Sequence, residues 1–134
     1  MAIMNKEVAL IYAALNGDIE CLRALLDAKA SVDAKNKWGT ALIWAVINGH
    51  IECVRALLEN GADVNAKNKW SNNTALIYAA ENGHIECVRA LLEAGASVDA
   101  RGLYGSTALM CAACHRNIEC VRALLEAGAD ADAK

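Results

Sequence analysis

Residues 74–100 read TALIYAAENGHIECVRALLEAGASVDA, and three other stretches of the chain repeat this sequence with few changes. The other copies are VALIYAALNGDIECLRALLDAKASVDA at 8–34, TALIWAVINGHIECVRALLENGADVNA at 40–66 and TALMCAACHRNIECVRALLEAGADADA at 107–133. Self-similarity at a fixed period of about 33 residues is typical of a linear array of stacked units. The repeat therefore predicts an extended binding surface rather than a globular core with a catalytic pocket.

The second copy shows the local structure expected of each unit. Thr40 can cap a helix with its hydroxyl, and the apolar residues after it recur at helical spacing until Gly49 ends the helix. A second helix is expected over 51–59, again with its apolar residues on one face. Residues 62–73 lack a helical period and are rich in Asn and Lys, which indicates an extended loop with a turn.

Helices of two or three turns are unstable alone in water, so each unit has to bury its apolar face against its neighbours. Adjacent leucines on the second helices are the expected contacts between units: Leu25-Leu26, Leu57-Leu58, Leu91-Leu92 and Leu124-Leu125. On the solvent side, Arg55 lies three residues after Glu52 and four before Glu59. This spacing predicts weak ion pairs within the helix.

The string Thr-Ala-Leu-x-x-Ala-Ala, followed by Gly-His and then Val-Arg-Ala-Leu-Leu-Glu-x-Gly-Ala-Asp-Val-Asn-Ala, resembles the ankyrin repeat. The resemblance covers residues 5–133. It implies an all-α solenoid of stacked helix-turn-helix units, with β-hairpin loops projecting at about a right angle. It also implies one domain over 1–134, with repeats at about 5–36, 37–68, 69–101 and 102–134. Members of this family bind other proteins through the hairpin tips and the first helices, which form a concave face.

The chain departs from this family pattern in several places. The family's Thr-Pro-Leu-His is Thr-Ala-Leu-Ile at 40–43 and 74–77 and Thr-Ala-Leu-Met at 107–110, which predicts looser loops. Lys29 and Arg116 replace glycines at helix ends, where a positive φ is expected. Neither end has the sequence of a polar cap, so we expect a monomer or a weak homodimer through uncapped terminal repeats.

All aromatic residues fall at two positions of the repeat. One position, on the first helix, faces the concave side in the ankyrin pattern, and the other lies at the hairpin tips. Exposed Trp and Tyr residues on one face are typical of interface hot spots, although they can also brace neighbouring loops. With the lysines and the leucine beside them, the expected partner-binding residues are Tyr12, Lys37, Trp38, Trp44, Lys69, Trp70, Tyr78, Leu103, Tyr104 and Cys111.

Composition argues against several other functions. The net charge of −3 and the lack of a continuous basic stripe argue against nucleic acid, and no segment is apolar for long enough to span a membrane. Cys21, Cys53, Cys87 and Cys120 share one repeat position, which favours buried thiols in a reducing compartment, the cytoplasm or the nucleus. Cys111, Cys114 and His115 lack the further ligands of a zinc site, so no metal or cofactor is expected. His50 and His84 are expected to hydrogen-bond neighbouring backbone.

These observations favour a non-catalytic protein-binding module, not an enzyme. Its partner is expected to be another protein that offers apolar side chains among carboxylates. By resemblance, an adaptor or a stoichiometric inhibitor is a plausible role. Two alternatives stay open: an engineered or reconstructed ankyrin scaffold, and a structural spacer from a longer array.

Overall fold

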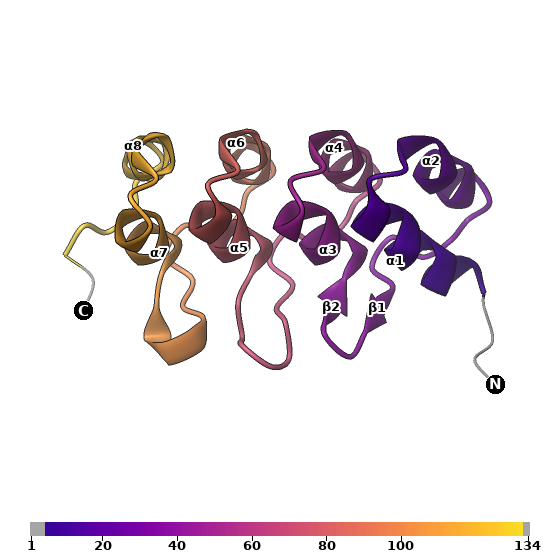
Figure 1. Cartoon of the computed structure of the whole chain (residues 1–134), viewed down its shortest axis with the longest axis horizontal. Coiled ribbons are helices and arrows are strands. Elements are labelled where there is room, and N and C mark those ends of the chain that lie inside the picture. Colours follow the sequence, from indigo (N-terminus) through magenta and orange to yellow (C-terminus); the bar gives the residue numbers. More distant parts are fainter. Residues whose placement is uncertain (1–4, 133–134) are drawn as a thin grey trace.

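The computed structural model describes residues 5–132, which form eight α-helices in a linear stack of four pairs (Figure 1). This arrangement confirms the predicted all-α solenoid. The elements are α1 (Lys6–Asn16), α2 (Ile19–Asp27), β1 (Lys35–Asn36), β2 (Gly39–Thr40), α3 (Ala41–Ile47), α4 (Ile51–Glu59), α5 (Ala75–Asn82), α6 (Ile85–Glu93), the 3₁₀ helix η1 (Leu103–Gly105), α7 (Ala108–Cys114) and α8 (Ile118–Glu126).

The first helices of the pairs form one layer and the second helices form another (Figure 1). Three loops extend from the side of the first helices, and we call them the fingers: residues 35–40, 67–74 and 101–107. Only the first finger contains a pair of strands, with Lys35 opposite Thr40. The second has a single bridge between Lys67 and Thr74, and the third contains η1. The expected β-hairpin is therefore regular in one finger only.

Threonines begin three of the four first helices, as the sequence predicts. The hydroxyl of Thr40 accepts the backbone N–H three residues later at 3.4 Å, and those of Thr74 and Thr107 do so at 3.3 Å. The predicted positive φ is also present at Lys29 (69°) and at Arg116 (59°). These two residues end helices without the conformational freedom of glycine, which costs roughly 1 kcal/mol each.

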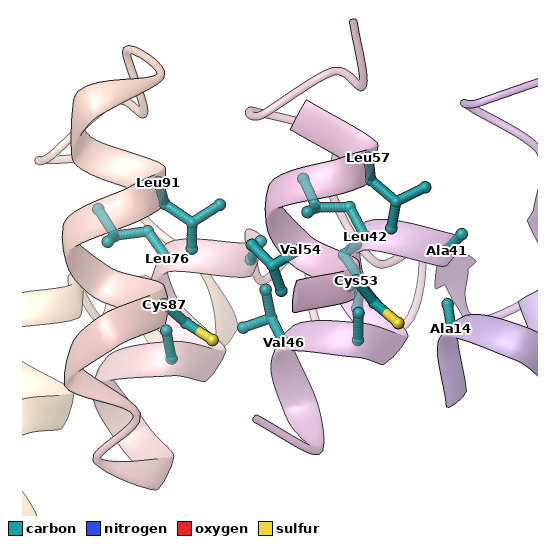
Figure 2. Packing of buried hydrophobic residues seen from close by; sticks show 14 of the residues in the cluster. Ala14, Ala41, Leu42, Val46, Cys53, Val54, Leu57, Leu76, Cys87 and Leu91 are labelled. Atoms are coloured by element: carbon teal, nitrogen blue, oxygen red, sulfur yellow. The ribbon is translucent and has the colours of Figure 1, made fainter. Parts of the chain in front are cut away.

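The core lies between successive pairs. Leu91 and Cys87 on α6 point toward the α3–α4 pair, and Val54 on α4 points toward the α5–α6 pair (Figure 2). Of the leucine pairs expected to join the units, the first member is fully buried in the three later repeats: Leu57, Leu91 and Leu124. The second members are only half-buried in the inner repeats, and Leu125 is exposed. The prediction thus holds for one leucine of each later pair.

The four equivalent cysteines do not share one environment. Cys53, Cys87 and Cys120 are buried, whereas Cys21 is exposed. The expectation of four core thiols is wrong for Cys21, because no repeat precedes α2 in the described chain. Burial raises the pKa of Cys87 to about 11, since a thiolate is poorly solvated there.

The ion pairs expected within the second helices are absent from the part of the chain that the structure describes. The one ion pair there joins Arg55 on α4 to Glu86 on α6 across 3.4 Å. The arginine reaches the next helix because the second helices lie side by side in one layer (Figure 1). Both side chains are exposed, so the pair contributes little to stability.

Polar side chains also join successive repeats through the backbone. His50 Nε2 donates to the carbonyl oxygen of Leu15 at 3.2 Å, and His84 Nε2 donates to that of Ile47 at 3.2 Å. Asn117 occupies the same position in the last repeat and donates to the carbonyl oxygen of Ala80 at 2.7 Å. These bonds confirm the predicted role of the two histidines and satisfy carbonyls at the ends of the first helices.

Polar contacts join the first turn of α1 to the loop after α2 in the N-terminal repeat. Asp18 replaces the inter-repeat histidine and instead accepts a backbone N–H of its own helix. Glu7 accepts the backbone N–H of Ser31 at 2.9 Å, and Lys6 donates to the carbonyl oxygen of Ala28 at 3.1 Å. These bonds lie within the first repeat and leave an apolar hollow between α1 and α2 at this end. The expectation that both ends lack a polar cap therefore stays a prediction.

Gly49→Ala is expected to destabilise the protein more than Gly61→Ala. Both glycines have positive φ, but a Cβ at Gly49 would lie 2.8 Å from the His84 ring, whereas Gly61 faces open space. We expect a loss of about 1 kcal/mol for Gly61→Ala and about 2–3 kcal/mol for Gly49→Ala, since the latter also displaces the histidine from its carbonyl. Urea unfolding measures both, and equal losses would show that the histidine contact contributes nothing.

Candidate protein-binding surface

Exposed apolar side chains gather on the fingers, which lie in a row along one side of the stack (Figure 1). The exposed fraction is 43% for Trp38, 79% for Trp70 and 95% for Tyr104, and Leu103 beside Tyr104 is also exposed. Each finger thus carries one exposed aromatic ring, and we call Trp38, Trp70 and Tyr104 the tip aromatics. Their positions are those that the sequence alignment predicts.

Asparagine side chains hold the first two fingers in place. Asn36 Oδ1 accepts the backbone N–H of Trp38 at 2.9 Å and that of Gly39 at 3.1 Å. In the second finger, Asn68 Oδ1 accepts the N–H of Trp70 at 2.7 Å. An asparagine that bonds the backbone two residues later fixes a turn locally. The two tryptophans are therefore presented on ordered turns.

The third finger is built differently. Tyr104 has a φ of 57°, a left-handed conformation that is uncommon for residues other than glycine. Arg101 holds the turn by donating to the carbonyl oxygen of Gly105 at 2.9 Å. Leu103 donates its N–H to Asn73 Oδ1 at 2.9 Å, which joins this finger to the second one. The sequence analysis did not predict the positive φ of Tyr104, because a tyrosine in a loop gives no local signal for this conformation.

The aromatic residues on the first helices are placed differently from those on the tips. Trp44 is half-buried, and its Nε1 donates to Asn36 Oδ1 at 3.4 Å. Tyr78 is also half-buried, and its hydroxyl oxygen lies 2.9 Å from that of Ser71. The polar end of each ring is therefore hydrogen-bonded to the finger of its own repeat. These two residues brace the fingers, whatever else they contact.

In the first and last repeats, this position on the first helix is occupied by Tyr12 and Cys111. Tyr12 is half exposed on α1, where no finger precedes the helix in the described chain. Cys111 is half-buried on α7, and burial is the largest cause that raises the pKa of its thiol. Since the thiolate is the reactive form, Cys111 is poorly suited to be a reactive group at neutral pH.

Tyr78→Phe is expected to loosen the second finger while the ring stays packed. Loss of the hydroxyl contact to Ser71 removes about 0.5–1.5 kcal/mol. Amide hydrogen exchange of residues 69–73 should become faster, with little change in the inner helices. Tyr12→Phe is the matched control, because Tyr12 lies on a helix without a finger, and it should leave exchange unchanged. Unaltered exchange in the Tyr78 variant would contradict the bracing role.

The fingers carry positive charge only. Their cations are Lys35, Lys37, Lys67, Lys69 and Arg101, and none of the three segments contains Asp or Glu. The Nζ of Lys37 lies 5.3 Å from the centre of the Trp38 ring. The single ion pair in residues 5–132 lies on the second helices, so no finger cation is paired with a carboxylate there. Apolar rings and unpaired cations thus share one surface.

The family model for ankyrin repeats (3 copies) matches residues 2–68 and 67–134, which together span nearly the whole chain. The chain is an ankyrin repeat protein. A comparison with curated proteins gives no match. Ankyrin repeats are generally protein–protein interaction modules and are typically non-catalytic.

Other surfaces of this ankyrin repeat protein carry fewer features that indicate a binding or catalytic site. A hollow of about 560 Å³ opens at the N-terminal end of the stack and is lined by Ala9, Tyr12, Ala13, Asn16, Asp18, Cys21, Ala24 and Leu25. It lies away from the fingers. Within residues 5–132, no cluster of three or more His, Cys, Asp or Glu side chains could hold a metal ion. No helix in that range is long and apolar enough to cross a membrane.

Thiol labelling of the native ankyrin repeat protein is expected to separate its six free cysteines into groups. Exposed Cys21 and Cys114 should react first, and half-buried Cys111 should react more slowly. Cys53, Cys87 and Cys120 should react only after unfolding, because each is buried between repeats. Mass spectrometry of peptides after timed alkylation measures the order. Early labelling of Cys87 would contradict the stacked core, and Cys21→Ser should remove one fast site.

Proposed function

We propose that this ankyrin repeat protein is a non-catalytic interaction module that binds a partner protein through its finger tips and the concave face of its first helices. The observation that supports this most strongly is the row of tip aromatics on ordered turns. Large apolar rings held in solvent cost solubility, and ordered turns lower the entropy lost on binding. The surface is therefore suited to recognition.

An adaptor or a stoichiometric inhibitor is the role that this surface supports best, because a rigid face that covers part of a partner can block it. The proposed interface includes all ten residues predicted from the sequence, with the tip aromatics and Leu103 as direct contacts. Trp44 and Tyr78 contribute chiefly by holding the fingers. The six free cysteines support a location in a reducing compartment, the cytosol or the nucleus.

Affinity capture from a cell lysate tests the proposal with three forms of the protein. The first is the unaltered chain, and the second is the tip variant, Trp38→Ala with Trp70→Ala and Tyr104→Ala. The third is a control with Ile118→Ala and Leu125→Ala, which removes exposed apolar side chains away from the fingers. Proteins recovered with the first and third forms, but lost with the tip variant, support the proposal.

Two outcomes would overturn it. A partner that is retained equally by all three forms binds elsewhere on the molecule. The absence of any partner in all three supports a scaffold or a spacer within a longer array instead. Circular dichroism of the tip variant should match that of the unaltered chain, because the replaced rings are exposed.

A further inference from the structure

We propose that the fingers bind an acidic segment in the polyproline II conformation, with an apolar side chain at every third residue. This inference rests on the proposed function and specifies the chemistry of the partner. It combines three observations on the fingers: their charge, their spacing and the local order of the turns that carry the tip aromatics.

Charge is the first observation. The five finger cations have no carboxylate partner within residues 5–132 and no acidic residue in their own segments. Asp33 and Asp99, near the finger bases, each accept a backbone N–H of the next repeat, at 2.8 and 2.9 Å, and within residues 5–132 neither forms an ion pair with a finger cation. Carboxylates of a partner would therefore meet unpaired cations, which favours both affinity and encounter rate.

The opposite layer has the reverse charge. Each of the second helices α2, α4, α6 and α8 carries two acidic residues and one arginine. An acidic segment is repelled by this layer and attracted by the fingers, which lie beyond the first helices (Figure 1). The charge distribution thus selects one side of the stack for such a partner.

Spacing is the second observation. Neighbouring packed helices lie about 8–10 Å apart, and each of the three later helix pairs is preceded by one finger with one tip aromatic. A polyproline II segment has three residues per turn and rises about 3.1 Å per residue, so residues i, i+3 and i+6 lie on one face about 9 Å apart. Its apolar side chains would meet successive fingers in register.

Other backbone conformations match less well. In a β-strand, residues i and i+3 point to opposite faces, and residues i and i+2 are only about 7 Å apart. A helix binds through a continuous apolar stripe at i, i+3, i+4 and i+7, which needs a continuous apolar groove. The tip aromatics are instead single rings on separate fingers, each preceded by a lysine or an apolar residue.

Local order is the third observation. Trp38 and Trp70 follow asparagine-bonded turns, and Tyr104 is held in a left-handed conformation with its ring exposed. Strained residues persist where the surrounding structure enforces them, often at binding sites. Rings that are carried on ordered turns suit a polyproline II ligand, which is itself extended in the free state and loses little entropy on docking.

Selection from a phage-displayed library of random 12-residue peptides tests this inference on the intact chain. Phage that also bind the tip variant are removed at each round. Enriched peptides are expected to contain excess Asp and Glu, with apolar residues at i, i+3 and i+6. A synthetic copy of the most enriched peptide should bind at least tenfold more weakly to Trp70→Ala and to Lys69→Glu. Raising the salt concentration from 50 to 500 mM should weaken it further.

A permuted peptide provides the matched control. It keeps the composition of the selected peptide but places the apolar residues at i, i+2 and i+4, and it should bind at least tenfold more weakly. Equal affinity of the permuted peptide would overturn the spacing argument. Enrichment of basic peptides, or of helical peptides with apolar residues at i, i+4 and i+7, would overturn the proposal, as would failure to enrich any peptide. Displacement of the peptide by a 12-nucleotide oligo-dT at lower concentration would indicate nucleic acid instead.

This experiment can fail while the proposed function stands. If lysate capture yields a protein that depends on the tip aromatics, but the bound region of that protein is helical or basic, only the inference about the ligand is wrong. If capture shows no dependence on the tips, the proposed function fails as well. The two results are separable because they use different probes.

Discussion

Replacement of Leu91 by alanine is expected to lower the free energy of unfolding by about 2–5 kcal/mol. Leu91 is fully buried on α6 and points toward the preceding α3–α4 pair (Figure 2). The second helices are nine residues long, too short to be stable alone, so contacts between repeats supply most of the stability. A cavity at this contact therefore weakens the array at its centre.

Leu25→Ala is the matched control, because Leu25 occupies the same position in the first repeat. It is only half-buried there, since no repeat precedes it in the described chain. We expect less than half of the loss seen with Leu91→Ala. Urea unfolding followed by circular dichroism measures both variants. Equal losses, or an unchanged urea midpoint for Leu91→Ala, would show that inter-repeat packing does not dominate stability.

Trp70→Ala is expected to weaken the affinity for a captured partner by about thirtyfold or more, the effect of a hot-spot residue of about 2 kcal/mol. The ring is mostly exposed, so its removal leaves the core intact and should change the thermal midpoint little. Isothermal titration with the captured partner measures the affinity, and differential scanning calorimetry measures the stability.

Trp44→Phe is the comparison for this prediction. It keeps an aromatic ring on α3 but removes the Nε1 contact to Asn36, so it should loosen the first finger and reduce the affinity only severalfold. Truncation of Trp44 to alanine, by contrast, is expected to lower stability, because the ring is half-buried and bonded to the finger. A larger affinity loss for Trp44→Phe than for Trp70→Ala would identify the first helices, not the tips, as the main contact.

The positions of the tip aromatics could be predicted from the sequence because they follow from the alignment of four similar units. Trp38, Trp70 and Tyr104 occupy one repeat position in the loops, and loop residues between stacked units lie at the surface. The bracing role of Tyr78 could not be predicted in this way. It depends on the distance between its hydroxyl and Ser71, which is set by how the loop folds back on α5.

The ends of the chain show a similar limit. Four equivalent cysteines have similar sequence contexts, yet Cys21 is exposed and Cys87 is buried. The difference arises because burial depends on whether a preceding repeat covers the residue. The contacts of Glu7 and Lys6 with the loop after α2 join residues more than 20 positions apart. Local patterns carry no information on such long-range contacts.

The amino-acid sequence by itself determined the repeating unit, its helix boundaries, the threonine caps and the face that each helix buries, because these depend on residues within a few positions of one another. Only the tertiary structure decided which equivalent residues are covered, how the three fingers differ, and which aromatic rings remain free for a partner. Those properties depend on contacts between repeats and on the way each loop packs against its own helix, and neither is encoded in the period of the sequence.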